Sequence, residues 1–119
     1  PATVDADPDR LRQVLANLVT NSAAAGARTV RIDILRDDRD RVGFRVADDG
    51  PGFPDHLLPS VFDRFVRGAA ARSGSGAGLG LSIVRAVVTA HDGTVEASNG
   101  PPLGGARVTV RLPARQPDP

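Results

Sequence analysis

Two glycine-rich clusters, on either side of a charged segment that contains phenylalanine, constrain this chain more than any other feature of its sequence. The first cluster, 48–52 (Asp-Asp-Gly-Pro-Gly), directly follows a strand-like run at 42–46. The second, 74–81 (GSGAGLGL), runs straight into an apolar pattern with helical spacing. A carboxylate at a strand end, a glycine-rich loop entering a helix and amide oxygens on a nearby helix suit a base, a phosphate chain and a divalent cation. Their order predicts nucleotide binding.

The first expected helix carries the amides. Asp7 and Pro8 form a helix start, because Asp is a favoured N-cap and Pro tolerates the first helical position. Apolar residues then recur with helical spacing at 11, 14, 15 and 18, and Gly26 is a C-cap candidate. Asn17 and Asn21 stand four apart, so both fall on one edge of this stripe. A single Asn is more often a surface residue, whereas the pair offers amide oxygens to Mg²⁺.

The remaining pattern predicts the fold class. Strand-like runs occupy 29–35, 42–47, 94–97 and 106–112, a short helix or two turns occupies 54–65, and a second strong helix follows the second glycine cluster. These elements predict an α+β fold: a two-layer α/β sandwich whose mixed, mostly antiparallel sheet of about five strands carries about three helices on one face. We expect one domain at 1–113, with a mobile lid at about 66–77, and a tail at 114–119.

Composition narrows the class of protein. A chain of 119 residues can bury a core without cross-links, and it contains no Cys for a disulfide or a Cys-based zinc site. The net charge of +1 indicates neither a nucleic-acid-binding nor a membrane-binding surface. No apolar run approaches the ~18 residues of a membrane span. Because the chain opens on Pro rather than Met, it reads as a fragment of a longer protein.

Each motif also has a structural alternative. Asp48 is either a turn former or the acceptor for the exocyclic amine of adenine. The loop at 74–80 is either a linker or a phosphate-binding loop at a helix N-terminus, and the apolar residues at core spacing after it favour the second. It matches neither a Walker P-loop nor a Rossmann turn. His56 and His91 lack ligand spacing and are expected to be structural or exposed.

Taken in order, the motifs resemble those of the catalytic and ATP-binding domain of two-component sensor histidine kinases, within the GHKL (Bergerat) superfamily that includes gyrase and MutL. Segment 17–22 (Asn-Leu-Val-Thr-Asn-Ser) resembles the N box and 48–52 the first glycine box. Segment 62–65 (Phe-Asp-Arg-Phe) resembles the F box and 76–81 the second glycine box, while 104–105 suits the weaker third one. The resemblance covers nearly the whole chain.

The resemblance implies roles for the matched positions, with ATP and Mg²⁺ as ligands. Asn21 would hold Mg²⁺, Asn17 would lie at the triphosphate or its water, and Asp48 would bind adenine. Arg67 would reach the γ-phosphate, so Asn17 and Arg67 are the candidate catalytic residues. The remaining implied nucleotide contacts are Gly50, Gly52, Phe53, Gly76, Ala77, Gly78, Leu79, Gly80 and Leu81. Asn17 stands where hydrolytic relatives carry a Glu base, which favours transfer to a partner nucleophile over water activation.

The chain departs from the family pattern at two places. Ala24 and Ala25 stand where the family often has a Lys that contacts phosphate and a Tyr that stacks on adenine. Their absence predicts weak nucleotide affinity, or a larger share for Arg67 and the lid. No segment resembles the phosphoacceptor helix, so we expect a kinase domain without its substrate histidine.

The resemblance therefore implies transfer of the ATP γ-phosphoryl group to a histidine on a dimerisation domain outside this chain, for relay to a response regulator. We expect the cytoplasmic domain of a membrane-bound bacterial sensor, without direct membrane or nucleic-acid contact. Two alternatives stay open: a degenerate nucleotide-binding module that signals by protein contact, and a serine kinase of the anti-sigma-factor type. The F box and the LGLSIV helix favour the histidine kinase.

Overall fold

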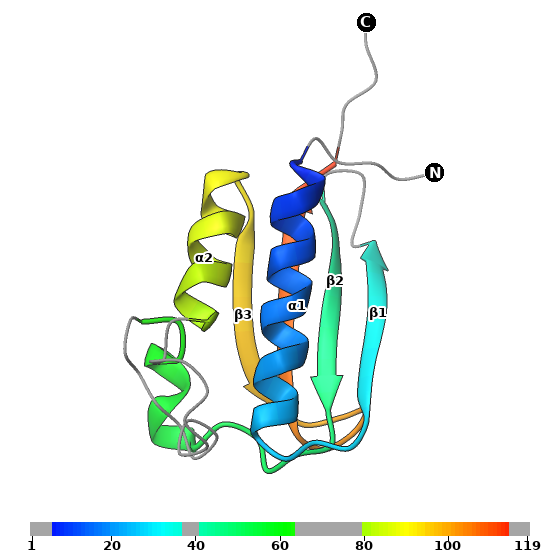
Figure 1. Ribbon diagram of the computed structural model, residues 1–119, viewed down its shortest axis with the longest axis vertical. Coiled ribbons are helices and arrows are strands. Elements are labelled where there is room, and N and C mark those ends of the chain that lie inside the picture. Colours follow the sequence, from blue (N-terminus) through cyan, green and yellow to red (C-terminus); the bar gives the residue numbers. More distant parts are fainter. Residues whose placement is uncertain (1–5, 37–40, 64–79, 115–119) are drawn as a thin grey trace, which may run out of the picture.

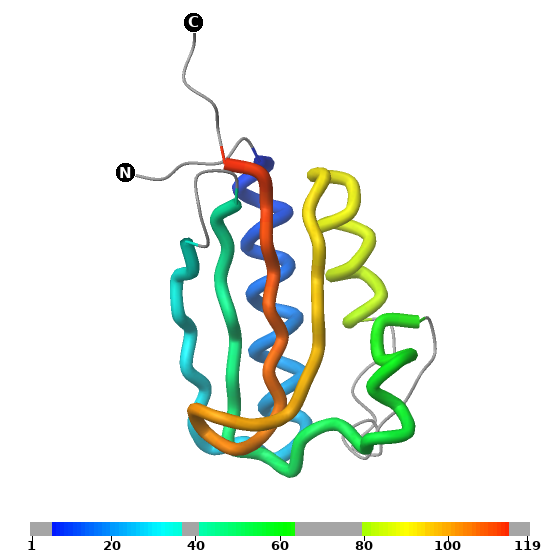
Figure 2. Tube along the Cα trace, turned by 180° about the vertical axis from the view of Figure 1, so that it is seen from behind, coloured from blue at the N-terminus to red at the C-terminus, as the bar shows by residue number. Residues whose placement is uncertain are grey.

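The computed structural model describes residues 6–36, 41–63 and 80–114. These residues form two layers, a four-stranded sheet and a layer of helices packed on one of its faces (Figure 1). Figure 2 views the sheet from its other face, which no helix of the described segments covers. The elements are α1 (Pro8–Ala24), β1 (Val30–Arg36), β2 (Arg41–Asp48), the 3₁₀ helix η1 (Asp55–Ser60), α2 (Gly80–Ala90), β3 (Thr94–Asn99) and β4 (Ala106–Pro113).

Helix α1 begins and ends as the sequence predicts. The Asp7 side chain caps the helix by accepting a hydrogen bond from the Asp9 N–H at 2.9 Å, and Pro8 occupies the first turn. Ala25 is the C-cap, and Gly26 follows it with φ of +94°. A side chain disfavours that left-handed conformation, so Gly26 lets the chain turn from α1 towards β1.

The sheet brings distant segments to one end of the molecule. Its strand order is β1-β2-β4-β3, and every neighbouring pair is antiparallel. Val30 pairs with Asp48, and Asn99 pairs with Ala106. Consequently β2 and β3 end where β1 and β4 begin, and Figures 1 and 2 show the connecting loops side by side at that end.

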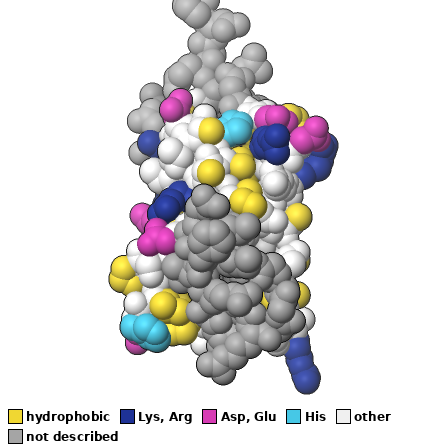
Figure 3. All heavy atoms as spheres, turned by 60° about the vertical axis from the view of Figure 1, so that its left-hand side comes forward, with side chains coloured by type: hydrophobic (Ala, Val, Ile, Leu, Met, Phe, Trp, Pro, Cys, Tyr) yellow, Lys and Arg dark blue, Asp and Glu magenta, His cyan; other side chains and the backbone are white. Residues whose placement is uncertain are grey.

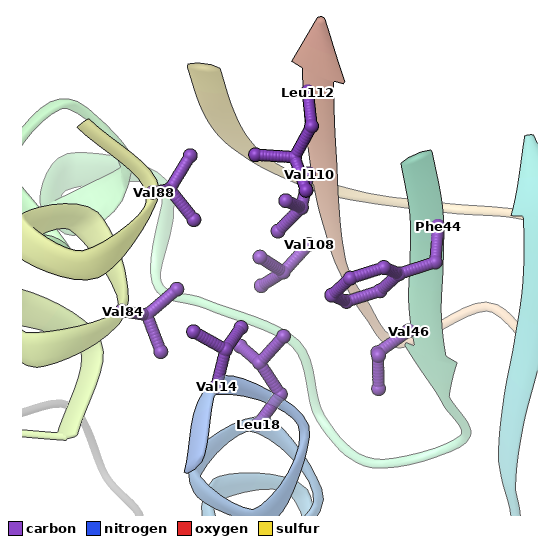
Figure 4. Packing of buried hydrophobic residues seen from close by; sticks show 9 residues of the cluster. All are labelled: Val14, Leu18, Phe44, Val46, Val84, Val88, Val108, Val110 and Leu112. Atoms are coloured by element: carbon purple, nitrogen blue, oxygen red, sulfur yellow. The ribbon is translucent and has the colours of Figure 1, made fainter. Parts of the chain in front are cut away.

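The core lies between the sheet and the two helices. Strands β2 and β4 contribute alternate side chains, as expected for a sheet covered on one face. Val14 of α1 and Val84 and Val88 of α2 are fully buried against them (Figure 4). The nine buried residues of this cluster are Val14, Leu18, Phe44, Val46, Val84, Val88, Val108, Val110 and Leu112. Eight of the nine are aliphatic, in a chain whose only aromatic residues are four Phe.

The edge strand β1 is less covered than its sequence predicts. Its apolar residues alternate as expected, and Val30 packs against the core. Further along the strand, however, Ile32 is 48% exposed and Ile34 is 78% exposed. Both belong to the edge strand, which lies to one side of α1 in Figure 1, and no helix of the described residues covers it.

The α+β class, the mostly antiparallel sheet and the helices on one face are confirmed. The described residues contain four strands where about five were expected, and every strand pair is antiparallel. The two α-helices and one 3₁₀ helix match the expected number of about three. Pro59 lies inside η1, and its missing N–H prevents a regular α-helix there. Strand β3 extends to Asn99 because its last residues pair with β4.

Candidate nucleotide-binding site

The predicted site residues that the structure describes gather at one end of the fold. Asp48 ends β2, and Gly50 and Gly52 follow it in the loop that leads to η1. The last turn of α1, which carries Asn21, lies at this same end, and α2 begins about midway along the sheet with its first residue directed towards this end (Figure 1). Sheet topology thus joins motifs that are separated by tens of residues in sequence.

Asp48 is a buried carboxylate held by backbone groups. It is 2% exposed, and its Oδ1 accepts hydrogen bonds from the N–H of Gly50 at 2.9 Å and of Ala106 at 3.1 Å. Its backbone carbonyl accepts from the N–H of Gly105 at 3.0 Å. Both side-chain bonds use Oδ1, and the described segments provide no donor for Oδ2. The carboxylate is therefore fixed in orientation, with one oxygen left to accept a further hydrogen bond.

Gly105 permits this arrangement because it has no side chain. A Cβ on Gly105 would lie 2.5 Å from both the carbonyl oxygen and Oδ1 of Asp48, and 2.7 Å from the carbonyl oxygen of Gly50. Real Cβ atoms do not approach oxygen so closely, so any other residue would displace the strand end. The second glycine of the 104–105 pair is therefore required for the β3–β4 loop to close on Asp48.

Asp49 has a different environment from its neighbour. It is exposed, and its Oδ1 accepts from the N–H groups of Arg28 at 2.8 Å and Thr29 at 3.0 Å. The hydrogen bond from Thr29, and then that from Arg28, lowers the pKa of Asp49 below its ordinary value of 3.8, since both favour the charged form. Through these two hydrogen bonds Asp49 holds the loop between α1 and β1 against the end of β2.

Asn99 holds the loop that follows Asp48, and reasoning from the sequence did not identify it as a candidate. Its Oδ1 accepts from the Phe53 N–H, and its Nδ2 donates to the Phe53 carbonyl, each at 2.8 Å. Gly52, just before Phe53, has φ of +80°. The Phe53 ring itself packs against the core. An Asn followed by Gly at a strand end was the available signal, but the residue it bonds lies 46 positions away.

Asn17 and Asn21 share one side of α1 with core residues. With Val14 and Leu18 they follow the i, i+3, i+4, i+7 spacing of a single helix face. The Val14 side chain lies next to Val84 of α2 in Figure 4, and helix geometry places the two amides on the same side of α1 as Val14. Both asparagines are half-buried. In the described ranges no group of three His, Cys, Asp or Glu residues could hold a metal ion.

Two residues of the second glycine box belong to α2. Gly80 begins the helix, and the described residues outside its own helix place no atom within 4 Å of the position that a Cβ would occupy there. Leu81 packs against the core. The other predicted contacts of this region lie outside the described residues, as does the expected lid at 66–77; they are Arg67, Gly76, Ala77, Gly78 and Leu79.

The F box is joined to α2 by an apolar and an ionic contact. Phe62 packs against the core, and the Asp63 carboxylate pairs with Arg85 of α2 at 3.3 Å. Both partners are about half exposed, so the pair stabilises little. Figure 3 shows this side of the molecule, where acidic and basic side chains lie next to each other among the coloured atoms.

The two histidines are exposed or structural, which confirms the expectation. His56 is exposed in η1. His91 is half-buried at the end of the sheet opposite Asp48, where its Nδ1 lies 2.8 Å from the Val87 carbonyl oxygen and its Nε2 accepts from the Asp7 N–H at 3.2 Å. It joins the end of α2 to the start of α1, away from the predicted nucleotide contacts.

Comparison with known proteins agrees with this fold. Residues 6–116 match the pattern of the histidine kinase-, DNA gyrase B- and HSP90-like ATPase family, and the chain belongs to that family. It is similar to the sensor histidine kinase component HK1 of Mycobacterium tuberculosis, with 44% identity over 96% of this chain and 67% of that protein. Among such relatives it corresponds to the ATP-binding domain of sensor histidine kinases.

Solved structures show the same fold. The mycobacterial sensor histidine kinase MprB superposes with a TM-score of 0.84 and 33% identity, over 98% of this chain and 80% of that one. Full-length ShkA in complex with AMPPNP gives a TM-score of 0.73 and 33% identity, over 92% of this chain and 22% of that one.

The chain spans only part of the length of other sequence relatives. Two further sensor kinases are matched over only 30% and 20% of their lengths. In the described segments neither helix is long and apolar enough to cross a membrane.

Proposed function

We propose that this domain binds Mg²⁺-ATP at the Asp48 end of the sheet and transfers the γ-phosphoryl group to a histidine of a dimerisation domain in the whole protein. The observation that carries the proposal is the buried Asp48 carboxylate, oriented through Oδ1 and open at Oδ2. Burying a charge is costly, and the fold does not need one at a strand end. A carboxylate kept there is explained by a ligand that it recognises.

Adenine fits this carboxylate by its hydrogen-bonding pattern. Its exocyclic amine is a donor, and Oδ2 of Asp48 can only accept while the group is ionised. In a buried site such a charge-assisted bond is stronger than at the surface. Gly50 and Gly52 keep the neighbouring backbone free of side chains, so a flat base can approach the loop between β2 and η1.

Asn21 and Asn17 suit the cation end of the nucleotide. Mg²⁺ prefers oxygen ligands and is often bound through a few protein oxygens together with phosphates and water. In that arrangement Asn21 supplies a side-chain oxygen, and Asn17 contacts the triphosphate or its water. When bound, the cation would neutralise charge on the phosphate oxygens. The related ShkA binds the ATP analogue AMPPNP, which supports this ligand class for the present chain.

The phosphate chain extends from the base towards the start of α2. Helix N-termini favour anions because their first N–H groups are unpaired and the helix dipole is positive there. Gly76, Gly78 and Gly80 would let the backbone wrap the phosphates, and Arg67 would neutralise the γ-phosphate during transfer. Because Ala24 and Ala25 supply neither a cation nor an aromatic surface, the glycine-rich backbone and Arg67 carry a larger share of the binding free energy.

Transfer needs a nucleophile from another domain. An imidazole nitrogen attacks the γ-phosphorus, the bond to the bridging β–γ oxygen breaks, and ADP leaves with its charge neutralised by the residues around it. Asn17 cannot accept a proton, so water is activated poorly and hydrolysis is slow. The phosphoryl group would then pass to a response regulator. In the whole protein this domain would act in the cytoplasm beside the dimerisation domain of a membrane-bound sensor.

Radiolabelling tests the proposal. The 119-residue chain alone should bind ATP without stable self-labelling, while adding the parent protein's dimerisation domain should produce an acid-labile, base-stable label, as expected for phosphohistidine. Arg67→Ala should reduce labelling sharply, whereas Arg31→Ala, on the uncovered face of the sheet, should not. An acid-stable label would instead identify a serine kinase. Nucleotide binding with no transfer to any partner would indicate a signalling module.

A further inference from the structure

We propose that Asn99 is a positioning residue for the base pocket, through which β3 fixes the loop between Asp48 and η1 before nucleotide binds. The inference deepens the proposed function and rests on it, because it assumes that this loop forms part of the base site. Asn99 lies outside every motif recognised in the sequence. Its contact with the loop also requires that position 52 be glycine.

Asn99 holds the backbone of Phe53 from both of its polar groups. The side-chain amide is an acceptor at Oδ1 and a donor at Nδ2, and it uses both against the N–H and the carbonyl of this one residue, at 2.8 Å each. Because the two bonds hold the N–H and the carbonyl of Phe53 at once, they fix the orientation of its backbone as well as its position. Asp offers no donor while ionised, and Ala offers neither group.

Gly52 allows the amide to come this close. A Cβ on Gly52 would lie 2.7 Å from Oδ1 of Asn99 and 3.0 Å from its amide carbon. The residue also has φ of +80°, which side chains disfavour. The second glycine of the first glycine box is therefore needed for the contact with Asn99 in addition to any approach by a base.

The same strand pair also holds Asp48. Asn99 and Ala106 are cross-strand partners at the end of β3 and the start of β4. Asn99 bonds Phe53, while the Ala106 N–H bonds Oδ1 of Asp48. One pair of facing residues therefore fixes both the strand end that carries the carboxylate and the loop that follows it.

This arrangement orders the pocket during folding. A loop that is already fixed loses less conformational entropy when a ligand binds, so affinity is higher than for a loop that must be ordered by the ligand. Both bonds of Asn99 are partly buried, which shields them from competition by water. Removing them should therefore weaken binding without removing any direct contact with the nucleotide.

The test compares three variants of the 119-residue chain: Asn99→Ala, Asn99→Asp and the control Ser98→Ala. Ser98 precedes Asn99 and bonds Arg107 at 3.0 Å, but it has no bond to the loop. For each protein, amide hydrogen exchange at Phe53 is followed by NMR, and a fluorescent ATP analogue is titrated. In Asn99→Ala we expect exchange at Phe53 to accelerate and affinity to fall, each by about tenfold, with Ser98→Ala unchanged.

Asn99→Asp separates positioning from packing, because the two side chains have nearly the same size. When ionised, the new carboxylate faces the Phe53 carbonyl oxygen and repels it; when protonated, it can donate and restore the second bond. The affinity of Asn99→Asp relative to wild type should therefore rise as the pH falls from about 7.5 towards the ordinary Asp value of about 3.9. Wild type titrated at the same pH values provides the reference for this ratio.

The outcomes separate this inference from the proposed function. If wild type binds ATP and Asn99→Ala binds equally well, the positioning role is wrong while the ATP site stands. A pH-independent ratio for Asn99→Asp would likewise assign Asn99 to packing alone. If wild type does not bind ATP at all, the proposed function fails, and the role of Asn99 in it fails with it.

Discussion

The two ends of the sheet are held together in different ways. At the Asp48 end, the side chains of Asp48, Asp49 and Asn99 all bond backbone groups, the most distant of them 58 positions away in sequence. At the opposite end, the bonds between side chains and distant backbone groups are longer: the His91 ring accepts from the Asp7 N–H at 3.2 Å, and the Arg41 guanidinium donates to the Asp92 carbonyl oxygen at 3.3 Å. At the first end several shorter bonds meet around Asp48 and the loop that follows it, whereas at the second end each bond joins a separate pair of segments.

Burial shows the same contrast. Among the described residues the buried polar or charged side chains are Ser22 and Asp48, and both lie towards the Asp48 end. Towards the other end the core is apolar, with Val88 and Leu112 almost completely buried. Burying a polar side chain costs free energy unless hydrogen bonds compensate it. Since the described structure buries Ser22 and Asp48 at one end only, we infer that this end is shaped for binding as well as for folding. Changes at the two ends should therefore separate binding from stability.

The largest loss of affinity is expected for Asp48→Asn. The amide oxygen can still accept from Gly50 and Ala106, so the fold should survive, but an NH₂ group then faces the adenine amine. Losing a charge-assisted hydrogen bond costs about 1.5–3 kcal/mol, which corresponds to at least about tenfold in affinity. Calorimetric titration with ADP and a thermal melt measure both quantities. Wild-type affinity together with wild-type stability would make Asp48 a turn residue.

A matched pair of glycine substitutions compares the two ends directly. A Cβ on Gly105 would meet Asp48 at 2.5 Å, and a Cβ on Gly93, at the far end, would meet the carbonyl oxygen of Arg111 at 2.5 Å. Both Gly→Ala changes should destabilise the domain by about 1–3 kcal/mol, the usual cost of overpacking. Denaturant unfolding measures this cost. Only Gly105→Ala should also weaken ADP binding, and equal loss in Gly93→Ala would contradict the separation of the two ends.

Asn21→Ala divides the site further. Removing one oxygen ligand should lower Mg²⁺-dependent ATP affinity several-fold, by about 1 kcal/mol, and leave adenosine binding little changed. Titrations of ATP with and without Mg²⁺, and of adenosine, give the comparison. The same weakening for adenosine and Mg²⁺-ATP would assign Asn21 to the packing of α1.

At the far end, Asp7→Ala should change stability alone. The substitution removes the N-cap bond to Asp9 and should cost about 0.5–2 kcal/mol. Equilibrium unfolding in urea measures the loss, while nucleotide titration serves as the control. A clear fall in affinity would mean that the start of α1 is coupled to the base pocket.

The smallest effect is expected from the titration of Asp49. Its pKa in the folded state is lowered by the hydrogen bonds from Thr29 and Arg28, so its contribution to stability is complete above the ordinary value of 3.8. The contribution is lost as the pH falls below 3.8 towards the folded-state pKa. The difference in melting temperature between wild type and Asp49→Asn should shrink over that range. A difference independent of pH would assign the effect to something other than charge.

Sequence predicted local features well and long-range contacts poorly. The start of α1, its end near Gly26 and the strand at 42–47 follow from caps and periodicity, which are short-range signals. Asp48 and Gly52 were proposed as site residues from their motif. Asn99 was missed because its partner lies 46 positions away and belongs to no periodic pattern. The four strands of the described residues coincide with strand-like runs in the sequence, but their order in the sheet, β1-β2-β4-β3, depends on contacts between distant segments.

The central claim is that Asp48 recognises the base of ATP, and a structure of the domain with a non-hydrolysable ATP analogue and Mg²⁺ tests it most directly. We predict that the exocyclic amine of adenine lies within about 3.2 Å of Oδ2 of Asp48, while Oδ1 keeps its bonds to Gly50 and Ala106. An adenine ring bound elsewhere, or one whose amine makes no contact with Asp48, would contradict it.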